Sequence, residues 1–146
     1  MSTVAPEHFT AAGQDRLPGL FGIEVLEVTA NLVRSRLEVT PSHLGLNGYL
    51  HAGTIVALAD TACGYGCGVT LPDGSVGFTT IELKVNFLGT TREGAITCEA
   101  RLAHAGRTTQ VWDATVADEN SGKIVAIFRC TQLVLYPTQS SSGPPA

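Results

Sequence analysis

The chain has 146 residues, with 9 Lys and Arg against 13 Asp and Glu, so its formal net charge is −4. This length suits a single domain. With 44% hydrophobic and only 15% charged residues, the chain is expected to fold rather than to stay disordered. A net negative charge without a basic cluster argues against nucleic acid as the main partner.

Targeting and membrane segments are not expected from the sequence. Residues 1–16 lack the apolar core of a secretory signal. The most apolar stretch, residues 50–71, is interrupted by Asp60 and several Gly, whereas a membrane helix needs about 20 consecutive apolar residues. The sequence therefore predicts a cytoplasmic protein that has no membrane partner.

The cysteines are predicted to be reduced core residues, which is typical of a cytoplasmic protein. They lie in apolar or strand-like segments and form no Cys-x-x-Cys pair, and the four His have no metal-type spacing. We therefore expect no metal site and no cofactor. These cysteines are Cys63, Cys67, Cys98 and Cys130.

The first half of the chain predicts two helices and two strands. Residues 5–17 are expected to form a short N-terminal helix, and residues 22–28 and 31–39 have the composition of strands. Residues 41–48 have loop composition. The best helix candidate runs from residue 53 to about residue 67, where the apolar side chains recur at helical spacing: Ile55, Ala59, Ala62 and Cys63.

The second half of the chain consists of strand-like segments rich in Val, Ile, Thr and Phe, separated by short turns. Their ranges are 77–87, 94–103, 107–117 and 123–135. Short connectors between consecutive strands imply antiparallel neighbours. Residues 137–146 have linker composition and are expected to be disordered.

These elements predict an α+β fold in one domain, residues 1–136, without internal repeats. A helix as apolar as the one predicted from residue 53 must be covered. The simplest cover is an antiparallel sheet of five to six strands wrapped around one long central helix.

One acidic residue stands out within the predicted central helix. Asp60 is the only Asp, Glu, Lys or Arg between residues 39 and 72, and its neighbours one turn away are apolar or glycine. A lone carboxylate on such a face carries a desolvation penalty unless a function or a partner uses it. A catalytic Asp60, a solvent-exposed Asp60 and an Asp60 bonded to a backbone amide all remain open.

The start of the same helix offers a second chemical group. Free N–H groups at a helix N-terminus can polarise a carbonyl, and the triplet His51-Ala52-Gly53 directly precedes the helix. Asp60 follows Ala52 by eight residues, or about 12 Å of helix, which is too far for both to reach one reacting carbon. If both act, a two-fold dimer must bring Asp60 of one subunit to the helix start of the other.

Three segments together resemble the hotdog-fold acyl-CoA thioesterases, and within them the phenylacetate-degradation (PaaI-type) thioesterases. Residues 46–67 resemble the HGG-x(6)-D/E helix signature of that family. Residues 79–94 are similar to its T-x-D/E-L-x-V-N-F-L strand, and residues 102–131 to its last two strands with their H-x-G-R turn. The resemblance covers roughly residues 18–136 and implies a hotdog fold and hydrolysis of acyl-CoA thioesters.

The resemblance also implies roles for individual residues of a catalytic site. Asp60 matches the carboxylate that acts as nucleophile or as general base for water, and the Ala52 N–H matches the group that polarises the thioester carbonyl. His51 and Gly53 complete that motif, with Ala52 in place of the family's first Gly. Thr80 matches a Ser or Thr that helps to place the water.

The resemblance further implies how substrate and subunits are bound. Arg92 and Arg107 fall where basic residues meet the phosphates of coenzyme A. The family's Asn or Gln six residues before the His is Gly45 here, and Asn47 lies four residues before His51. The family has Arg-Pro where residues 89–90 are Gly-Thr. Family members are homodimers, often paired into homotetramers, with the site between two subunits.

Two other functions remain as alternatives. The first is a non-catalytic protein that binds or senses acyl-CoA on the same fold, and the second is a hotdog hydratase. Retention of Asp60 favours hydrolysis over binding alone, and hotdog hydratase sites usually pair a helix-proximal His with Asp in a different motif. The residue types near the predicted site do not distinguish aryl from aliphatic acyl groups.

Overall fold

The structure is a computed structural model that describes residues 4–138, so the tail predicted to be disordered lies outside the described residues from 139 onward. Three helices, one 3-10 turn and six strands follow one another along the described part of the chain. In chain order they are α1 Pro6–Ala12, α2 Leu17–Phe21, β1 Ile23–Val28, β2 Leu32–Glu38, η1 Pro41–His43, α3 Ala52–Val69, β3 Gly77–Phe87, β4 Ala95–Ala105, β5 Thr109–Asp118 and β6 Ile124–Leu135.

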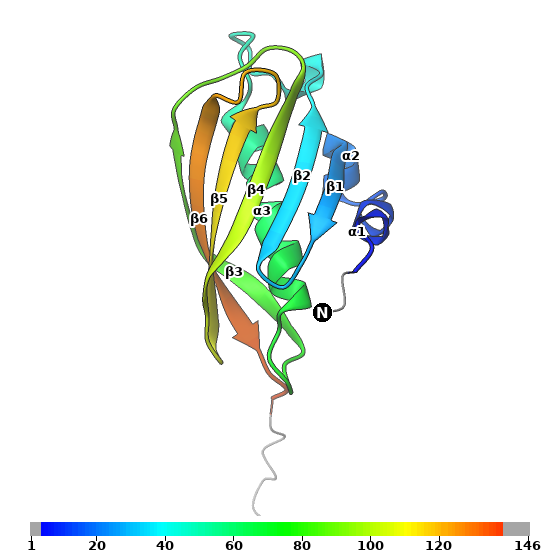
Figure 1. The fold of residues 1–146 in the computed structure, drawn as a ribbon, viewed down its shortest axis with the longest axis vertical. Coiled ribbons are helices and arrows are strands. Elements are labelled where there is room, and N and C mark those ends of the chain that lie inside the picture. The colour runs from blue at the N-terminus through cyan, green and yellow to red at the C-terminus, as the bar shows by residue number, and fades with distance from the viewer. Residues whose placement is uncertain (1–3, 139–146) are drawn as a thin grey trace, which may run out of the picture.

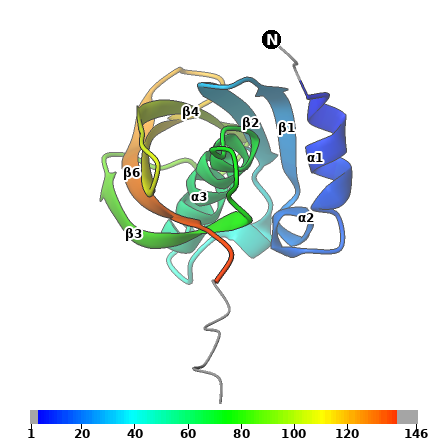
Figure 2. The ribbon, with the colours of Figure 1, turned by 90° about the horizontal axis from the view of Figure 1, so that it is seen from below.

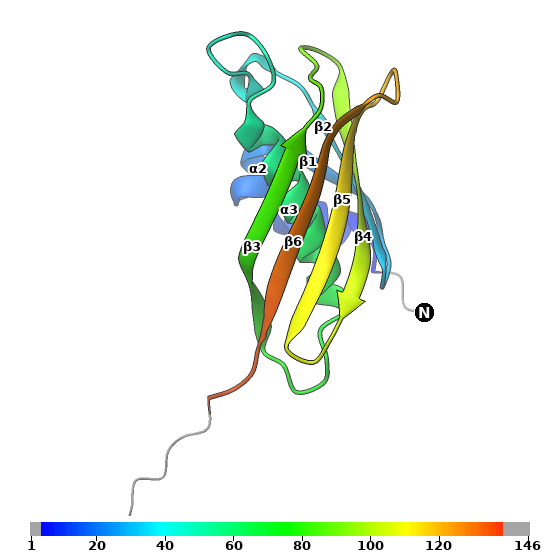
Figure 3. The same cartoon turned by 90° about the vertical axis from the view of Figure 1, so that its left-hand side faces the viewer.

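The strands form one antiparallel sheet in the order β1-β2-β4-β5-β6-β3, so β1 and β3 are its two edges (Figure 3). Figures 1 and 2 show the sheet curled around α3, with α1 outside the sheet beside β1. This arrangement confirms the predicted α+β architecture of a six-stranded sheet around one central helix.

The central helix is held by apolar side chains that recur every three or four residues. Its buried positions are Thr54, Ile55, Leu58, Ala59, Ala62, Cys63, Gly66 and Cys67. They pack against the concave face of the sheet, whose largest fully buried residues include Trp112, Leu37 and Ile96. All four cysteines are buried and unpaired. α3 begins one residue earlier and ends two residues later than predicted.

The prediction of one N-terminal helix over residues 5–17 is wrong. The segment forms two short helices, because α1 ends at Ala12 and the chain turns through residues 13–16 before α2 begins. Pro18 lies in the first turn of α2, where its missing N–H is tolerated and its fixed φ suits a helix, so it favours the start of a new helix here rather than the continuation of α1. The Gly19 N–H instead bonds to the Gly13 carbonyl at 2.9 Å, which packs α2 back against the end of α1.

The turn predicted at residues 104–106 lies further along the chain. β4 continues to Ala105 and β5 starts at Thr109, and the Gly106 N–H closes the hairpin on the Thr109 carbonyl at 2.8 Å. The register of this pair shifts between Leu102 and His104, where β4 contains an extra residue. Such a bulge interrupts the two-residue alternation on which the prediction depends.

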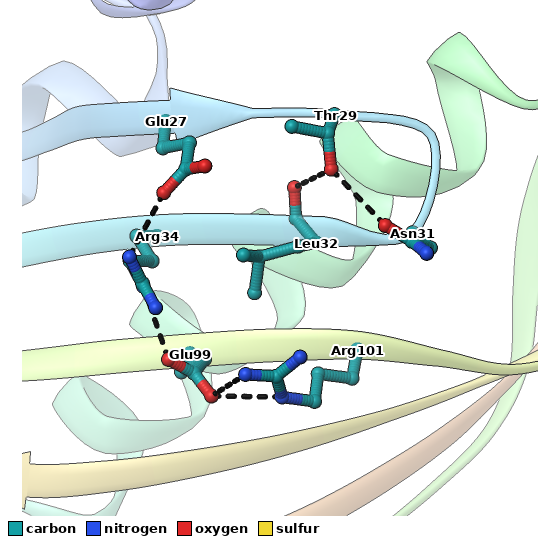
Figure 4. Close-up of polar contacts among 7 residues, drawn as sticks. All are labelled: Glu27, Thr29, Asn31, Leu32, Arg34, Glu99 and Arg101. Atoms are coloured by element: carbon teal, nitrogen blue, oxygen red, sulfur yellow. Dashed lines mark hydrogen bonds and ion pairs between the residues drawn. The ribbon is translucent and has the colours of Figure 1, made fainter.

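The convex face of the sheet is polar and carries ladders of opposite charges (Figure 4). Arg34 lies between Glu27 and Glu99, at 3.0 Å from each, and Arg101 also contacts Glu99. These side chains are partly exposed, so each pair contributes little to stability. At the β1–β2 turn the Thr29 hydroxyl donates to the Leu32 carbonyl at 3.2 Å.

The edge strand β3 carries apolar side chains that the rest of the described chain does not cover. Leu83 and Phe87 lie opposite the buried Cys130 and Ala126 of β6, so they face the helix side of the sheet. They are nevertheless 42% and 48% exposed, and Ile81, at the β3 bulge, is 55% exposed. β3 therefore presents both a free backbone edge and an apolar margin.

Candidate functional site

Asp60 lies in the middle of α3, at the wall of a pocket of about 420 Å³. The pocket is bounded by α3, by the first residues of β3 and by the N-terminal helices α1 and α2. Its lining is Phe9, Pro18, Asp60, Thr61, Gly64, Tyr65, Gly68, Phe78 and Thr80. Three aromatic rings, one carboxylate and two threonines thus line a mostly apolar space.

The environment of Asp60 disfavours its charged form. The side chain is half-buried, and within residues 4–138 its Oδ1 is buried without a hydrogen-bond partner. Burial raises the pKa of Asp60 above its ordinary value, and a hydrogen bond donated by the nearby Thr80 hydroxyl would lower it to a smaller extent. Within residues 4–138, no Lys, Arg or His lines this pocket to compensate the charge. A carboxylate held in this way is a stronger base than one in water.

Thr80 lies on β3 and lines the pocket, as its predicted role requires, but its hydroxyl donates to a residue outside the pocket lining. The Thr80 hydroxyl donates to the Gln132 Oε1 at 2.7 Å, and Gln132 is fully buried on β6. The sequence pattern does not single out Gln132. The one signal is a polar residue among the inward-facing positions of β6, where its alternate neighbours are Phe128, Cys130 and Val134.

The predicted helix-start residues lie together at the first turn of α3. His51 is the N-cap, and its ring Nδ1 accepts a hydrogen bond from the Gly53 N–H at 2.8 Å. A Cβ at residue 53 would lie 2.9 Å from that nitrogen, so the contact needs glycine. The Thr54 N–H bonds to the His51 carbonyl at 3.0 Å. Among the described residues, no group accepts a hydrogen bond from the N–H of the exposed residue Ala52.

The loop before α3 holds this helix start in place through His43. The His43 carbonyl accepts both the His51 N–H at 3.0 Å and the Thr54 hydroxyl at 2.9 Å. The His43 ring is buried and bonds through Nε2 to the Phe21 carbonyl at 2.9 Å. This histidine therefore joins α2, the loop and α3 without facing the pocket.

Two further predicted residues lie near the helix start. Asn47 is exposed in the preceding loop, where its Oδ1 accepts the Tyr49 N–H at 3.1 Å. The Arg92 guanidinium lies over the Tyr49 ring, 4.1 Å from its centroid. Asn47, Tyr49 and Arg92 thus surround the same end of α3 as the free Ala52 N–H.

Arg107 is the one predicted residue that the structure does not bring near the others. It lies in the β4–β5 turn, beside the Tyr136 ring, and the Tyr136 hydroxyl donates to its carbonyl. Arg92 precedes β4 and Arg107 follows it, so the strand separates them by about 30 Å at roughly 3.3 Å per residue. One chain cannot hold one coenzyme A molecule with both arginines at neighbouring phosphates.

Within one chain the candidate residues therefore form two groups on the same helix. Asp60 and Thr80 line the pocket beside the middle of α3, and His51, Ala52, Gly53, Asn47 and Arg92 surround its start. The eight residues from Ala52 to Asp60 span about 12 Å of helix. Neither group alone can both polarise a carbonyl and attack it.

Two further features concern the described part of the chain. Within residues 4–138, no group of three or more His, Cys, Asp and Glu is placed to hold a metal ion. Over the same range, each helix is too short or too polar to span a membrane.

The sequence matches a known protein family. The family described as the thioesterase superfamily matches residues 47–125, a range that contains the start of α3, Asp60 and Thr80. The chain belongs to the thioesterase superfamily. Among its relatives is the 1,4-dihydroxy-2-naphthoyl-CoA hydrolase of Listeria monocytogenes, 34% identical over 110 residues, which cover 75% of this chain and 88% of the relative.

Solved structures of this superfamily have the same fold. A mutant thioesterase, PA1618 of Pseudomonas aeruginosa, is 27% identical with a TM-score of 0.86, over 92% of this chain and 96% of the other. The PaaI protein of the Escherichia coli phenylacetic acid degradation operon has a TM-score of 0.76 at 22% identity, over 92% of this chain and 99% of its own. The hotdog fold expected from the sequence is confirmed, and the chain is an enzyme of the thioesterase class.

Proposed function

We propose that this thioesterase hydrolyses acyl-CoA, releasing a free acid and coenzyme A, at a site made by two copies of the chain. The Ala52 N–H of one subunit polarises the thioester carbonyl, with the positive end of α3 behind it. Asp60 of the other subunit either removes a proton from the attacking water or attacks the carbonyl carbon itself. His51 and Gly53 hold the helix start, and Thr80 helps to place the water.

The observation that carries this proposal is the state of Asp60. An ionised carboxylate with a buried, unpartnered oxygen is costly in a folded protein. Here it faces a pocket large enough for an acyl group and has no cation on the pocket wall to stabilise it. This arrangement is costly for stability but favours a reactive base or nucleophile.

The exposed edge strand β3 supports the proposal that a second subunit completes the site. A long free edge with apolar side chains is a surface on which another chain pairs. Pairing there would cover Ile81, Leu83 and Phe87, and it would bring a second copy of α3 beside the first. We propose a homodimer through β3, and two such dimers as a homotetramer.

The substrate class rests on the relatives and on the basic residues near the helix start. Arg92 lies at the same end of α3 as Ala52, where its guanidinium can meet a coenzyme A phosphate. Arg107 can contact the same coenzyme A molecule only if it belongs to a different subunit from Arg92. Asn47 is exposed in the same loop and can contact bound substrate. The four unpaired cysteines support a reducing, cytoplasmic compartment.

An assay across an acyl-CoA panel tests the proposal, beginning with 1,4-dihydroxy-2-naphthoyl-CoA, which the relatives' names suggest. Other aryl and aliphatic acyl groups complete the panel. Asp60→Asn should lower turnover by about 10²- to 10⁴-fold, because it removes the base while keeping the shape. Asp73→Asn, an exposed aspartate in the turn before β3, is the matched control and should change nothing.

Near-normal turnover in Asp60→Asn would overturn the proposal. Binding without product release in the wild type would favour the alternative of an acyl-CoA sensor. A single turnover in isotope-labelled water separates the two chemical routes. On the base route the label enters the released acid, whereas on the nucleophile route hydrolysis of the acyl–Asp60 anhydride at the Asp60 carbonyl leaves the label in Asp60.

A further inference from the structure

A short hydrogen-bonded chain lies directly behind the Asp60 pocket. Thr80 on β3 and Gln132 on β6 are cross-strand partners, and the Thr80 Oγ1 donates to the Gln132 Oε1 at 2.7 Å. The Gln132 Nε2 in turn donates to the Cys130 Sγ at 3.4 Å. Gln132 is fully buried, so water cannot substitute for either partner.

The Thr80 hydroxyl has one proton, so it can donate to Gln132 or to Asp60 but not to both at once. In the structure Gln132 takes that proton, and the Asp60 Oδ1 is left without a partner among the described residues. Only lone pairs of the Thr80 oxygen then remain for a group in the pocket. Thr80 can therefore accept a hydrogen bond there but cannot donate one.

We propose that Gln132 is a positioning residue for hydrolysis, because it takes the Thr80 proton and so turns the Thr80 lone pairs toward Asp60 and the pocket. This inference rests on the proposed function. On the general-base route, the attacking water gives one proton to Asp60 and donates its second O–H to Thr80. The water oxygen then bonds to the carbonyl carbon, the C–S bond breaks, and the proton on Asp60 passes to the departing thiolate.

The same orientation also keeps Asp60 reactive. A hydrogen bond donated by Thr80 would stabilise the carboxylate and make it a weaker base and a weaker nucleophile. The other titratable groups beside Asp60 are the Cys63 thiol, one turn along α3, and the Tyr65 phenol in the pocket wall. A hydrogen bond with Cys130 and burial raise the pKa of the Cys63 thiol, and burial raises the pKa of the Tyr65 phenol, so both groups are neutral near pH 7. Gln132 thus controls whether Thr80, a nearby donor from the sheet, can bond to Asp60.

The chain contains a matched control for Gln132. Gln110 lies directly opposite it on β5 and is equally buried. Its Oε1 accepts from Trp112 at 2.9 Å and from Thr70 at 3.1 Å, and neither Gln110 nor those partners line the Asp60 pocket. Replacing either glutamine by methionine, which is unbranched and of similar length, removes a buried amide. Gln110→Met also leaves the buried Trp112 N–H unpaired, so it is the more severe structural change of the two.

The experiment measures two quantities in Gln132→Met, Gln110→Met and the wild type. The first is the pKa of the Asp60 carboxyl from a carbon-13 NMR titration, assigned with Asp60→Asn. The second is the pH dependence of kcat and KM. In Gln132→Met we expect the Asp60 pKa to fall by about one unit, and the acidic limb of the pH profile of kcat to move to lower pH by the same amount. We also expect kcat to fall by about 10-fold with KM nearly unchanged, and Gln110→Met to move neither quantity.

Thr80→Val supplies the decisive double-mutant comparison. If Gln132 acts through Thr80, adding Gln132→Met to Thr80→Val should change the Asp60 pKa and kcat no further. Full additivity would overturn the proposal, as would an unchanged Asp60 pKa in Gln132→Met. If Gln132→Met does not fold, Gln132→Leu gives the same comparison, since its branched side chain fills the site differently.

The NMR arm separates this proposal from the proposed function. A lowered Asp60 pKa in Gln132→Met, together with no hydrolysis of any acyl-CoA by the wild type, would uphold the orientation of Thr80 and overturn the hydrolytic function. Hydrolysis that depends on Asp60, with no pKa change in Gln132→Met, would uphold the function and overturn the role of Gln132.

Discussion

At the scale of single residues, Asp60 shows a conflict between stability and chemistry. Its pKa is raised in the folded chain, chiefly by burial, so folding favours the protonated form. Stability contributed by this residue is therefore present at low pH and falls as pH rises from the ordinary aspartate pKa, about 3.9, through the folded value. Near neutral pH the charged carboxylate destabilises the fold.

Asp60→Asn should consequently melt above the wild type at pH 7, by at least about 2 °C, because the neutral amide carries a smaller desolvation cost. The difference should shrink as the pH approaches 4, where the wild-type carboxyl becomes protonated. Thermal melts followed by circular dichroism across that pH range measure it. A variant less stable than the wild type at pH 7 would mean that the Asp60 carboxylate is satisfied in the assembled protein.

The residues of the site differ in how far the sequence alone could predict them. Asp60 was predictable because a single charge in a long uncharged stretch is visible in one sequence, and Ala52 because it precedes a periodic apolar segment. Gln132 was not, because its significance comes from a partner 52 positions away in the chain. A contact across the sheet depends on strand register, which one sequence does not specify.

At the scale of elements, α3 depends on one close approach to the sheet. A Cβ at Gly66 would lie 2.3 Å from the Trp112 ring. That ring is fully buried and held by its Nε1 bond to Gln110. The helix therefore packs against β5 at this turn only because residue 66 has no side chain.

Gly66→Ala should lower the free energy of unfolding by about 1–3 kcal/mol, despite the better helix propensity of alanine. Gly68→Ala is the matched control on the same helix, since its Cβ would meet the Phe78 ring at an ordinary 3.8 Å. The control should be neutral or stabilising. Urea denaturation of both variants measures the difference, and equal stability of the two would show that Trp112 can move aside.

The elements themselves were largely predictable, and the exceptions have local causes. α3 and the six strands follow from residue periodicity, which packing on one face imposes. The break between α1 and α2 is not predicted, although Pro18 signals a helix start, because apolar residues lie on both sides of it: Phe9 and Ala12 before it and Leu17 after it. The β4–β5 turn was misplaced because a bulge alters the alternation.

At the scale of the whole molecule, a site shared between two subunits requires two chains to pair along β3. Leu83→Lys places a charge on the apolar margin of that edge and should give a monomer with little activity, while the fold and Asp60 remain intact. Leu20→Lys, on α2 and 82% exposed, is the control and should leave the assembly unchanged. Sedimentation velocity measures the assembly, and an active monomer of Leu83→Lys would contradict the composite site.

The central claim is that Ala52 of one subunit and Asp60 of another form each site. Ala52→Pro removes only the free N–H, because proline is favoured at the first helical position and His51 already has the extended backbone that must precede it. This variant should lose about 10²- to 10³-fold in kcat, and Asp60→Asn should also be nearly inactive.

Subunit mixing of these two inactive variants tests the claim most directly. A hybrid dimer contains one site with both an intact Ala52 and an intact Asp60, so random exchange should restore about a quarter of wild-type activity. Each variant remixed with itself is the control. No recovery, in a mixture where mass spectrometry detects the hybrid, would show that the two residues do not act together across the subunit interface.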